Sequence, residues 1–483
     1  MARFQPVEAF HPAPGTLALL PFRFERIEKH YLVSNMAGDF IRLSSDELAR
    51  LVELRLRPGD GLYEKAYAGH LISGADQKAK LQILAFRLRS RLAFLRETTP
   101  LHIFVVTLRC EHSCPYCQVS RQSTDRSRFD MSEETARSAL DIAFNSPSTR
   151  IKIEFQGGEP LLNFSLISTI VSAAKSKAAA TNKKVDFVIA SNLALLDEII
   201  LAFCKKNDVL LSTSLDGPAD LHNKNRPRPG GNSHELATSG IRRAQAALGS
   251  ERVGALMTTT EASLDRVEEI VDEYLRLNLD GIFLRPLSPY GFAIKTKAFR
   301  KYGSIDWLTF YERGLRYVLE INRRGTHFPE FYATLILKRM LSDRPIGYVD
   351  LRSPAGIGLG ALVYNYDGKV FASDEGRMLA EMGDRTFELG TVTDSYRSLV
   401  LSDKLIELIS SSLTQCAPEC SDCVFESHCG ADPVYHHATQ ADPVGIKPLS
   451  EFCARQKGVM RLLLDLLENS PQDAAILRRW GGM

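Results

Sequence analysis

The sequence predicts an α/β protein built around a parallel sheet. Between residues 101 and 284, short apolar segments typical of strands alternate with amphipathic segments typical of helices. This alternation indicates a parallel sheet with right-handed crossovers, either an open doubly wound sheet or a full or partial barrel. In these folds the chemistry gathers where strands end and loops begin. The expected strands are 102–108, 151–155, 185–190, 209–215, 253–257 and Gly281–Leu284, and the helices between them are 133–144, 165–180, 195–205, 239–248 and 264–275.

The segments on either side of this core form separate units. Ser44 and Glu47 make a capping box that opens a helix after three short strands near the N-terminus, and a basic helix with a solvated face follows. Beyond the core, Asp367-Gly368 predicts the turn of a hairpin. The division we expect is a small α+β module of sheet plus helices at 1–98, the α/β core at 99–305, a helical connection at 306–345, a cysteine-rich domain at 346–458 and a C-terminal helix at 459–483.

Composition limits the class of protein. The chain has 483 residues, of which 44% are hydrophobic and 24% charged, as in soluble globular proteins of more than one domain. The net charge of +2 gives no general attraction to nucleic acid or to a membrane surface. Residues 1–11 lack the basic and apolar regions of a signal peptide, and no apolar run is long enough to span a bilayer. We therefore expect a cytoplasmic protein without a nucleic-acid or membrane partner.

The nine cysteines are grouped. Three lie between Cys110 and Cys117, four lie between Cys416 and Cys429, and Cys204 and Cys453 stand apart. In a reducing compartment such groups indicate metal sites rather than disulfides. Cys204 lies in an apolar stretch, which predicts a buried core thiol.

The first group, Cys110-x3-Cys114-x2-Cys117, directly follows the first strand of the core. Three thiolates leave one iron of a four-iron cluster without a protein ligand. That open iron could chelate the amino and carboxylate groups of S-adenosylmethionine (SAM), and an electron passed to the sulfonium would release a 5′-deoxyadenosyl radical. The alternative is a zinc site of three cysteines and His112. His112 lies only two residues from its neighbouring cysteines, which is short for zinc-ligand spacing.

This motif, with Tyr116 before its last cysteine, resembles the radical SAM superfamily, and so does Gly157-Gly158-Glu159-Pro160 after the second strand. The resemblance implies a partial (β/α)6 TIM-like barrel of the radical SAM type and a [4Fe-4S] cluster that binds SAM. It also implies that the glycine backbone of the second segment binds the SAM amino group, where small residues permit close approach.

Two strand ends extend the resemblance. Ser191-Asn192 closes the third strand, where the superfamily presents polar groups to SAM. Ser214-Leu215-Asp216-Gly217-Pro218, followed by His222 and Arg226, looks like the corresponding run of the peptide-modifying branch. This implies that Ser214 and Arg226 lie near the SAM carboxylate, which a guanidinium can bind through two hydrogen bonds. Asp216 is either part of this site or only part of a turn, and Arg285 is either a site residue or a surface arginine.

The second group, Cys420-x2-Cys423-x5-Cys429 with Cys453 further on, resembles the SPASM domain of peptide-maturing radical SAM enzymes. That domain has seven cysteines and two auxiliary four-iron clusters. The four cysteines here resemble the set that holds one of them, which implies a single closed auxiliary [4Fe-4S] cluster suited to electron relay. A structural zinc site with four cysteine ligands is the alternative.

The cysteines of the other auxiliary cluster are missing. Ala355, Ser373 and Pro433 stand at or near the positions where they would fall. Cys416 is an additional candidate ligand of the remaining cluster. His428, His436 and His437 lie close by in the sequence, and we interpret them as ordinary polar residues.

The resemblance implies a ribosomally made peptide or protein as substrate and an electron donor such as flavodoxin or ferredoxin. Residues 118–122 resemble the radical SAM maturase of the His-Xaa-Ser peptide system. The N-terminal module resembles domains that bind a leader peptide by strand addition, although it could be only a structural cap.

Two alternative functions remain. One is a sulfatase-type maturase that oxidises Cys or Ser, and the other is a non-enzymatic iron–sulfur or zinc regulator. No catalytic acid or base is identified, and Asp216, Glu375 and Tyr364 are candidates by region.

Overall fold

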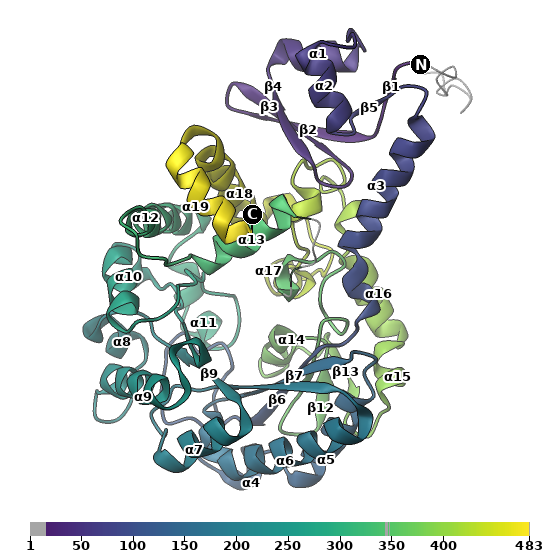
Figure 1. The fold of residues 1–483 in the computed structure, drawn as a ribbon. Coiled ribbons are helices and arrows are strands. Elements are labelled where there is room, and N and C mark those ends of the chain that lie inside the picture. The colour runs from purple at the N-terminus through teal and green to yellow at the C-terminus, as the bar shows by residue number, and fades with distance from the viewer. Residues whose placement is uncertain (1–15, 343–345, 347, 483) are drawn as a thin grey trace.

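The computed structural model describes residues 16–342, 346 and 348–482, and its centre is one eight-stranded sheet. Five parallel strands follow one another in chain order from β6 to β10 and curve into part of a barrel (Figure 1). These strands are β6 (Leu101–Thr107), β7 (Arg150–Gly157), β8 (Lys184–Ala190), β9 (Val209–Ser214) and β10 (Val253–Leu256). The first five expected strands are therefore confirmed.

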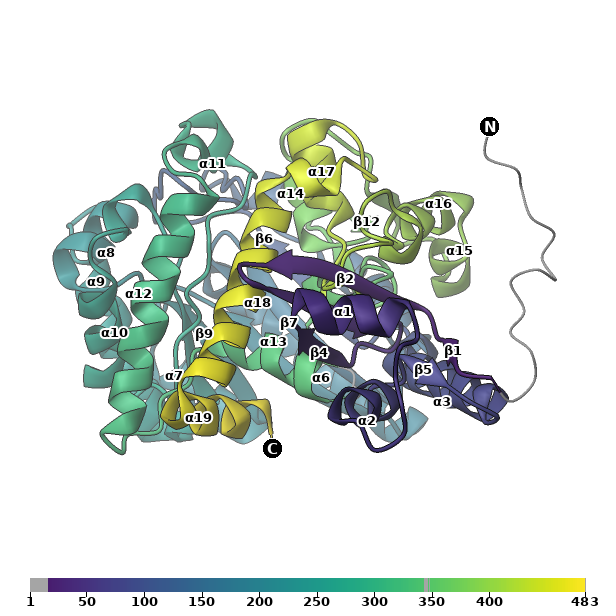
Figure 2. The ribbon, with the colours of Figure 1, turned by 90° about the horizontal axis from the view of Figure 1, so that it is seen from above.

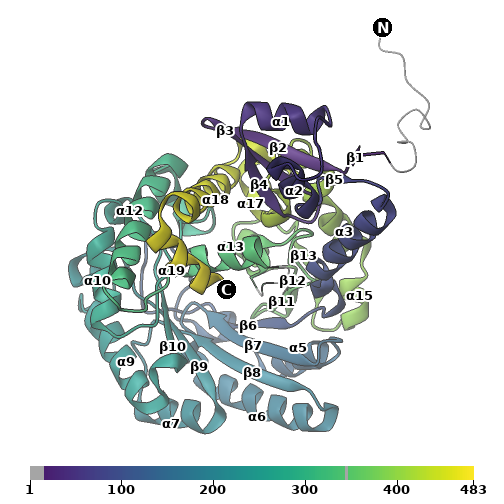
Figure 3. The same ribbon diagram turned by 45° about the horizontal axis from the view of Figure 1, so that its top comes forward.

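The helices that connect these strands cover the outer side of the sheet (Figure 3). They are α5 (Glu133–Phe144), α6 (Phe164–Thr181), α7 (Glu198–Asn207), α9 (Ser233–Leu248) and α10 (Val267–Arg276), with the short α8 (Ala219–Asn225) after β9. Side-chain caps fix several of their starts, because Ser132 accepts from Thr135 N and Asp197 accepts from Ile200 N. Cys204 is buried in the core that these helices form with the sheet, as expected.

The expected sixth strand at Gly281–Leu284 is wrong. Ile282 makes only a single parallel bridge, to Glu330, and not a ladder with β10. The buried Glu330 carboxylate accepts from Leu284 N (3.1 Å), so a side chain supplies a partner that a neighbouring strand would have given, and it also accepts from Ala333 N (2.6 Å) as a helix cap. The ring continues instead through helices that pack on one another: α12 (Ser304–Arg323), α13 (Phe331–Leu341), α18 (Glu451–Asn469) and α19 (Pro471–Gly481) (Figure 1).

The predicted hairpin is confirmed, and it extends the central sheet at the opposite edge. β11 (Ala361–Tyr364) pairs in parallel with β6, in the register Leu362 to His102, and antiparallel β12 (Lys369–Phe371) and β13 (Glu388–Thr391) follow. His102 Nδ1 and Tyr364 Oη are 2.9 Å apart across this junction. The shorter helices of the C-terminal part are α14 (Asp374–Ala380), α15 (Tyr396–Val400), α16 (Asp403–Ser411) and α17 (Pro433–Gln440).

The three strands expected in the N-terminal module are present as β2 (Phe22–Ile27), β3 (His30–Asn35) and β4 (Phe40–Leu43), and they form an antiparallel sheet. Ser44 and Glu47 form the predicted capping box of α1 (Ser45–Val52). The remaining elements are β1 (Ala18–Leu19), α2 (Gly61–Ala68), β5 (Ile72–Ser73) and the basic α3 (Gln77–Arg91). The sheet lies beside α18, to which Glu25 is ion-paired through Lys457 and Arg461 (Figure 2). No helix among the described residues has the length and apolar character needed to cross a membrane.

Candidate active site

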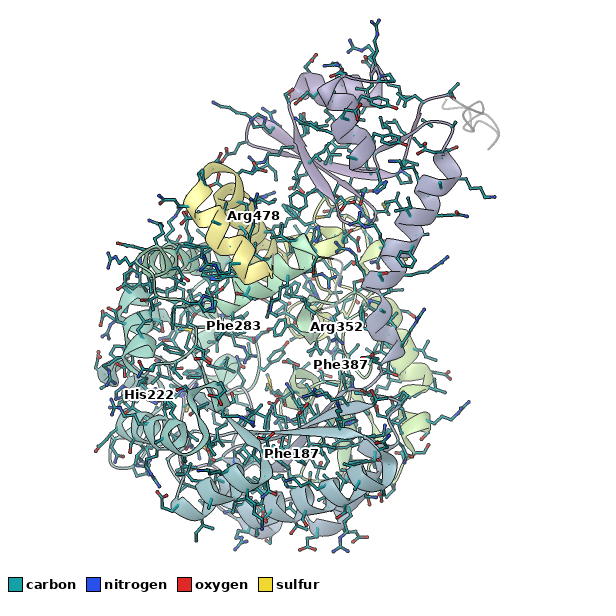
Figure 4. All side chains as sticks on the ribbon, in the orientation of Figure 1. Phe187, His222, Phe283, Arg352, Phe387 and Arg478 are labelled. Carbon is teal, nitrogen blue, oxygen red and sulfur yellow. The ribbon has the colours of Figure 1, made fainter. Side chains whose placement is uncertain are left out.

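A cavity of about 650 Å³ lies where the parallel strands end. Its lining brings together the three cysteines of the first group and the ends of β7, β8 and β9. Phe283, on the inner side of the ring of elements (Figure 4), contributes to an apolar wall together with Phe331 and Leu335. The cavity therefore joins residues from most of the chain length, and the first cysteine loop (Cys110–Cys117) forms one end of it.

Backbone contacts hold the first cysteine loop in place. Ser113 N donates to Pro227 O (2.7 Å), and Phe292 N donates to Cys117 O (2.7 Å), so segments far away in the sequence support both halves of the loop. Burial raises the pKa of Cys114 to about 12 and also raises that of Cys110. These thiols therefore need a bound cation to become the thiolates that act as metal ligands.

The arrangement fits an iron–sulfur cluster better than the alternative zinc site. Among the described residues, the one group with ligand atoms within 4.8 Å of one another is Cys110, Glu111 and His112, and Cys114 and Cys117 are outside it. A zinc ion needs its four ligands around one centre. A four-iron cluster binds each thiolate to a different iron and tolerates this wider spacing. His112 is engaged elsewhere, because its Nε2 is 2.8 Å from Ser233 Oγ and its Nδ1 is 3.1 Å from Glu111 Oε1.

Asp216, two residues after the end of β9, anchors the first cysteine loop. Its fully buried carboxylate accepts from Tyr116 Oη, from Arg226 Nε (3.0 Å) and from Thr258 N (3.2 Å). The Arg226 guanidinium also lies 5.4 Å from the centre of the Tyr116 ring. Arg226 lines the cavity but is already paired with Asp216, and Asp216 does not line the cavity. Asp216 is thus a positioning residue in this structure rather than a free base.

A second connection runs through Ser233, the first residue of α9. Its hydroxyl lies 2.8 Å from His112 Nε2 and 3.1 Å from His222 Nε2. His222, which lies in the layer of α8 and α9 (Figure 4), is in turn 3.2 Å from Asp216 N through its Nδ1. The first cysteine loop is therefore held at His112 and at Tyr116 by one continuous network. Sequence reasoning missed Ser233, which lies 121 residues from His112 and carries no motif signal.

The glycine segment fits closely against the end of β6. A Cβ atom on Gly157 would stand 2.1 Å from Thr107 O, and one on Gly158 would stand 2.2 Å from Arg109 O. Gly158 N also donates to Thr107 O (2.8 Å). Both glycines line the cavity. Their lack of a side chain is therefore already required by the packing of the chain against itself, before any ligand is considered.

Glu159 and Pro160 do not line the cavity. Glu159 is 1% exposed and joins the ends of β7 and β8, because it accepts from Ser191 Oγ (2.7 Å) and Asn192 N (2.8 Å). Burial, followed by the nearby Glu111 charge, raises the pKa of Glu159 to about 8. Its position indicates a structural role in bringing Ser191 and Asn192 to the cavity edge.

The other polar strand ends do face the cavity. Ser191, Asn192 and Ser214 are all in its lining, as is Tyr116. Thr213 was not predicted, yet it lines the cavity, is 3% exposed, and its hydroxyl has no hydrogen-bond partner among the described residues. The signal that could have found it is the run of hydroxyl side chains from Ser212 to Ser214 at the end of a strand.

The cavity lining also includes the three positions at which cysteines of a second auxiliary cluster would fall, namely Ala355, Ser373 and Pro433. Glu375 lines the cavity as well, whereas Tyr364 does not. Tyr364 is fully buried and stacks on His102, so it is a core residue. Arg285 lines the cavity and is therefore a site residue by position.

The second cysteine group does not line the cavity: Cys453 lies on α18, and the loop that carries Cys420, Cys423 and Cys429 contacts the N-terminal sheet. Burial raises the pKa of Cys429, and the thiolates of Cys453, Cys423 and Cys420 raise it further, so the four sulfurs act on one another. Within the described part of the chain, the sulfur atoms of these cysteines are not close enough together to hold a single metal ion. Cys416 is exposed, in contrast to the other four.

The histidines near this group are hydrogen-bonded elsewhere. His428 Nε2 lies 2.8 Å from Gly38 O, His436 Nδ1 lies 2.6 Å from Asp432 O, and His437 Nε2 lies 2.7 Å from Asp384 Oδ2. These contacts are consistent with ordinary polar residues, and that interpretation stays a prediction.

Comparison with known proteins agrees with this geometry. Residues 104–274 match the model of the radical SAM superfamily. An uncharacterized protein of Methanocaldococcus jannaschii is 31% identical over 189 residues, which are 39% of this chain and 62% of that protein. A cysteine-type anaerobic sulfatase-maturating enzyme of Clostridium perfringens is 30% identical over 120 residues, 24% of this chain and 32% of the relative. The chain therefore spans less than two thirds of the length of either relative.

Two solved structures share the fold. Native anSMEcpe with bound AdoMet superposes with a TM-score of 0.65 at 17% identity, over 79% of this chain and 99% of that one. SuiB of Streptococcus suis bound to its precursor peptide SuiA gives a TM-score of 0.51 at 13% identity, over 88% and 97%. The expected fold class is confirmed, and residues 104–274 match the radical SAM superfamily model.

Proposed function

We propose that this chain is a radical SAM enzyme that modifies a ribosomally made peptide or protein. The observation that carries the proposal is the cavity in which Cys110, Cys114 and Cys117 meet the polar ends of three parallel strands. A [4Fe-4S] cluster on these thiolates would supply the open iron and the electron for reductive cleavage of SAM, and so start hydrogen abstraction from the substrate.

The chain's own residues would bind and orient SAM. Asn192, Ser214 and Arg226 line the cavity and offer hydrogen-bond donors to its polar groups. Arg226 would receive the SAM carboxylate while its other side stays bound to Asp216, and bidentate donors suit such a carboxylate. The apolar wall that contains Phe283 would keep water away from a reactive species.

A peptide substrate is supported by two features. The likeness in fold extends to SuiB with its precursor peptide and to anSMEcpe with a bound peptide. In the N-terminal sheet, β2 and β4 each pair with β3 alone, so within the described residues each has one unpaired edge to which a peptide strand could add. We include leader-peptide recognition by this module in the proposal.

The finer identity of the substrate rests on residues 118–122. Gln118, Val119 and Arg121 of this stretch line the cavity, next to Cys117. The stretch that resembles the maturase of the His-Xaa-Ser system is thus placed where it could contact a substrate. We propose a peptide of that system as the substrate, with flavodoxin or ferredoxin as electron donor and the cytoplasm as location.

We also propose one auxiliary [4Fe-4S] cluster on Cys420, Cys423, Cys429 and Cys453. Four thiolates carry negative charge, and the cations Lys447, Lys457 and Arg339 all lie close enough to act on the pKa values of these cysteines. The residues present therefore fit a closed anionic cluster, which relays electrons and does not bind substrate. The exposed Cys416 is left out of this set.

Oxidation of a Cys or Ser in a sulfatase is the second candidate function. The 30% identity to a cysteine-type anaerobic sulfatase-maturating enzyme favours it. The cavity wall opposes it, since Ala355, Ser373 and Pro433 replace ligands for a second auxiliary cluster. Oxidation of a cysteine-containing sulfatase peptide by the reconstituted protein would select this candidate over the His-Xaa-Ser peptide.

Anaerobic reconstitution followed by iron counting and an assay for 5′-deoxyadenosine tests the main proposal. We expect about eight irons per chain, four for each of two clusters, and release of 5′-deoxyadenosine from SAM under strong reductant. Cys204→Ala is the matched control, because it removes a buried core thiol away from both groups. Wild-type protein that holds its iron but cleaves no SAM would refute the proposal.

A further inference from the structure

The N-terminal sheet contacts the second cysteine loop (Cys420–Cys429) directly. Arg23 of β2 donates to Ser421 O (2.5 Å) and forms an ion pair with Glu426 (3.2 Å), in which both side chains are almost fully buried. Ser34 of β3 donates to Val424 O (2.8 Å). The module is therefore one wall of the site that holds this loop, and not an appendage joined by a linker.

One residue of this wall reaches the thiols through a shared cation. Glu25 of β2 is 3.3 Å from Lys457 Nζ and is also paired with Arg461. Lys457 follows Cys453 by one helical turn on α18, so the two side chains share a face of the helix. Lys457 thus stands between a carboxylate of the N-terminal sheet and the cysteines of the auxiliary site.

The charges at this point act on one another in a consistent way. The Lys457 ammonium acts on Cys423 by its charge and by a hydrogen bond. Glu25, Cys423 and Cys453 in turn all lie near enough to act on the charge of Lys457. Lys457 is therefore a positive charge shared between the Glu25 carboxylate and the cysteine sulfurs.

We propose that Glu25 and Lys457 couple the N-terminal sheet to the auxiliary cluster and set its reduction potential. The inference rests on the auxiliary cluster proposed above. A cation beside a cluster stabilises its reduced, more negative state, and the potential of such clusters depends on nearby charge and on hydrogen bonds to sulfur. Lys457 raises the potential, and Glu25 lowers it by its own charge and by drawing Lys457 away from Cys423.

The test is a redox titration of the auxiliary cluster followed by electron paramagnetic resonance. Cys110, Cys114 and Cys117 are replaced by Ala in the full-length chain, so that the second group alone gives a signal. Lys457→Met is expected to lower the midpoint potential and Glu25→Gln to raise it. If the triple replacement does not fold, the same titration is made on the intact protein, in which added SAM changes only the signal of the open cluster.

The matched control is Glu468→Gln. Glu468 pairs with Arg42 (2.7 Å) and so also joins the N-terminal sheet to α18, but it lies about 16 Å further along the helix than Lys457. The Glu468→Gln replacement should therefore leave the midpoint potential of the auxiliary cluster unchanged. Equal potentials in all three variants, or shifts of one sign for Lys457→Met and Glu25→Gln, would overturn the coupling. Zinc in place of a reducible cluster would overturn the auxiliary cluster itself, a result that iron and zinc counting distinguishes.

Discussion

The two cysteine groups of this chain sit in different electrostatic surroundings. Around the first cysteine loop, the carboxylates of Glu111, Glu159 and Asp216 lie near the thiols together with the Arg226 guanidinium, and the loop opens onto a cavity. Around the second, Lys447, Lys457 and Arg339 supply positive charge, and the loop is covered by the N-terminal sheet. The first site has room and hydrogen-bond donors for a ligand, whereas the second has charge compensation and no opening to the cavity.

This difference indicates how one chain could hold two clusters with separate tasks. An open iron needs space for SAM and needs its loop fixed, which the network through Asp216 and Ser233 provides. A closed cluster needs compensation of its charge and shielding by protein, which the cations and the ion pair of Arg23 with Glu426 provide.

The largest effect expected is the separation of the two sites by cysteine replacement. Cys114→Ala should abolish 5′-deoxyadenosine formation and leave about four irons per chain, because only the first cluster loses a ligand. Cys429→Ala should also leave about four irons but should retain cleavage of SAM when a chemical reductant replaces the relay. Iron counting and product analysis on both variants check this. Complete loss of iron in either variant would show that the sites are not independent.

Asp216→Asn tests the anchor of the first cysteine loop. The change leaves the buried Arg226 cation without its counter-charge, and breaking a buried pair in this way costs about 3–5 kcal/mol of unfolding free energy. Asp220→Asn is the control, because its pair with Arg266 is largely exposed and should contribute less than about 1 kcal/mol. Denaturant unfolding of both variants measures the difference. Equally small losses of unfolding free energy in both variants would show that Asp216 does not hold the loop in place.

The parts of the site that could be predicted from sequence are those encoded in short local motifs. The spacing of Cys110, Cys114 and Cys117 and the polar ends of strands are visible in short segments, because parallel strands place their ends at one edge. Ser233 could not be found, since its role depends on bringing His112 and His222 together across the fold. The error at Gly281–Leu284 has a similar cause: its partners are the backbone around Glu330 and the buried carboxylate of Glu330, which no strand pattern reveals.

Gly158→Ala tests the close contact between the glycine segment and β6. The added Cβ would stand 2.2 Å from Arg109 O, a backbone atom that cannot move aside easily, so a loss of about 1–3 kcal/mol in unfolding free energy is expected. Gly254→Ala is the control, because no atom lies within 4 Å of a Cβ built there. Thermal unfolding of the metal-free proteins compares the two. A neutral Gly158→Ala would mean that the contact with β6 does not require glycine.

The smallest effect expected is a pH dependence of stability that arises from Glu159 in the first site. Burial raises the pKa of Glu159 from 4.5 to about 8, so between these values the folded chain binds a proton that the unfolded chain releases. Its contribution to stability is therefore largest below pH 4.5 and is lost as pH rises through about 8. Glu159→Gln cannot titrate, so the difference in melting temperature between wild type and variant should change in the variant's favour as pH rises. If the difference in melting temperature between the two metal-free proteins stays constant across this pH range, the raised pKa of Glu159 is contradicted.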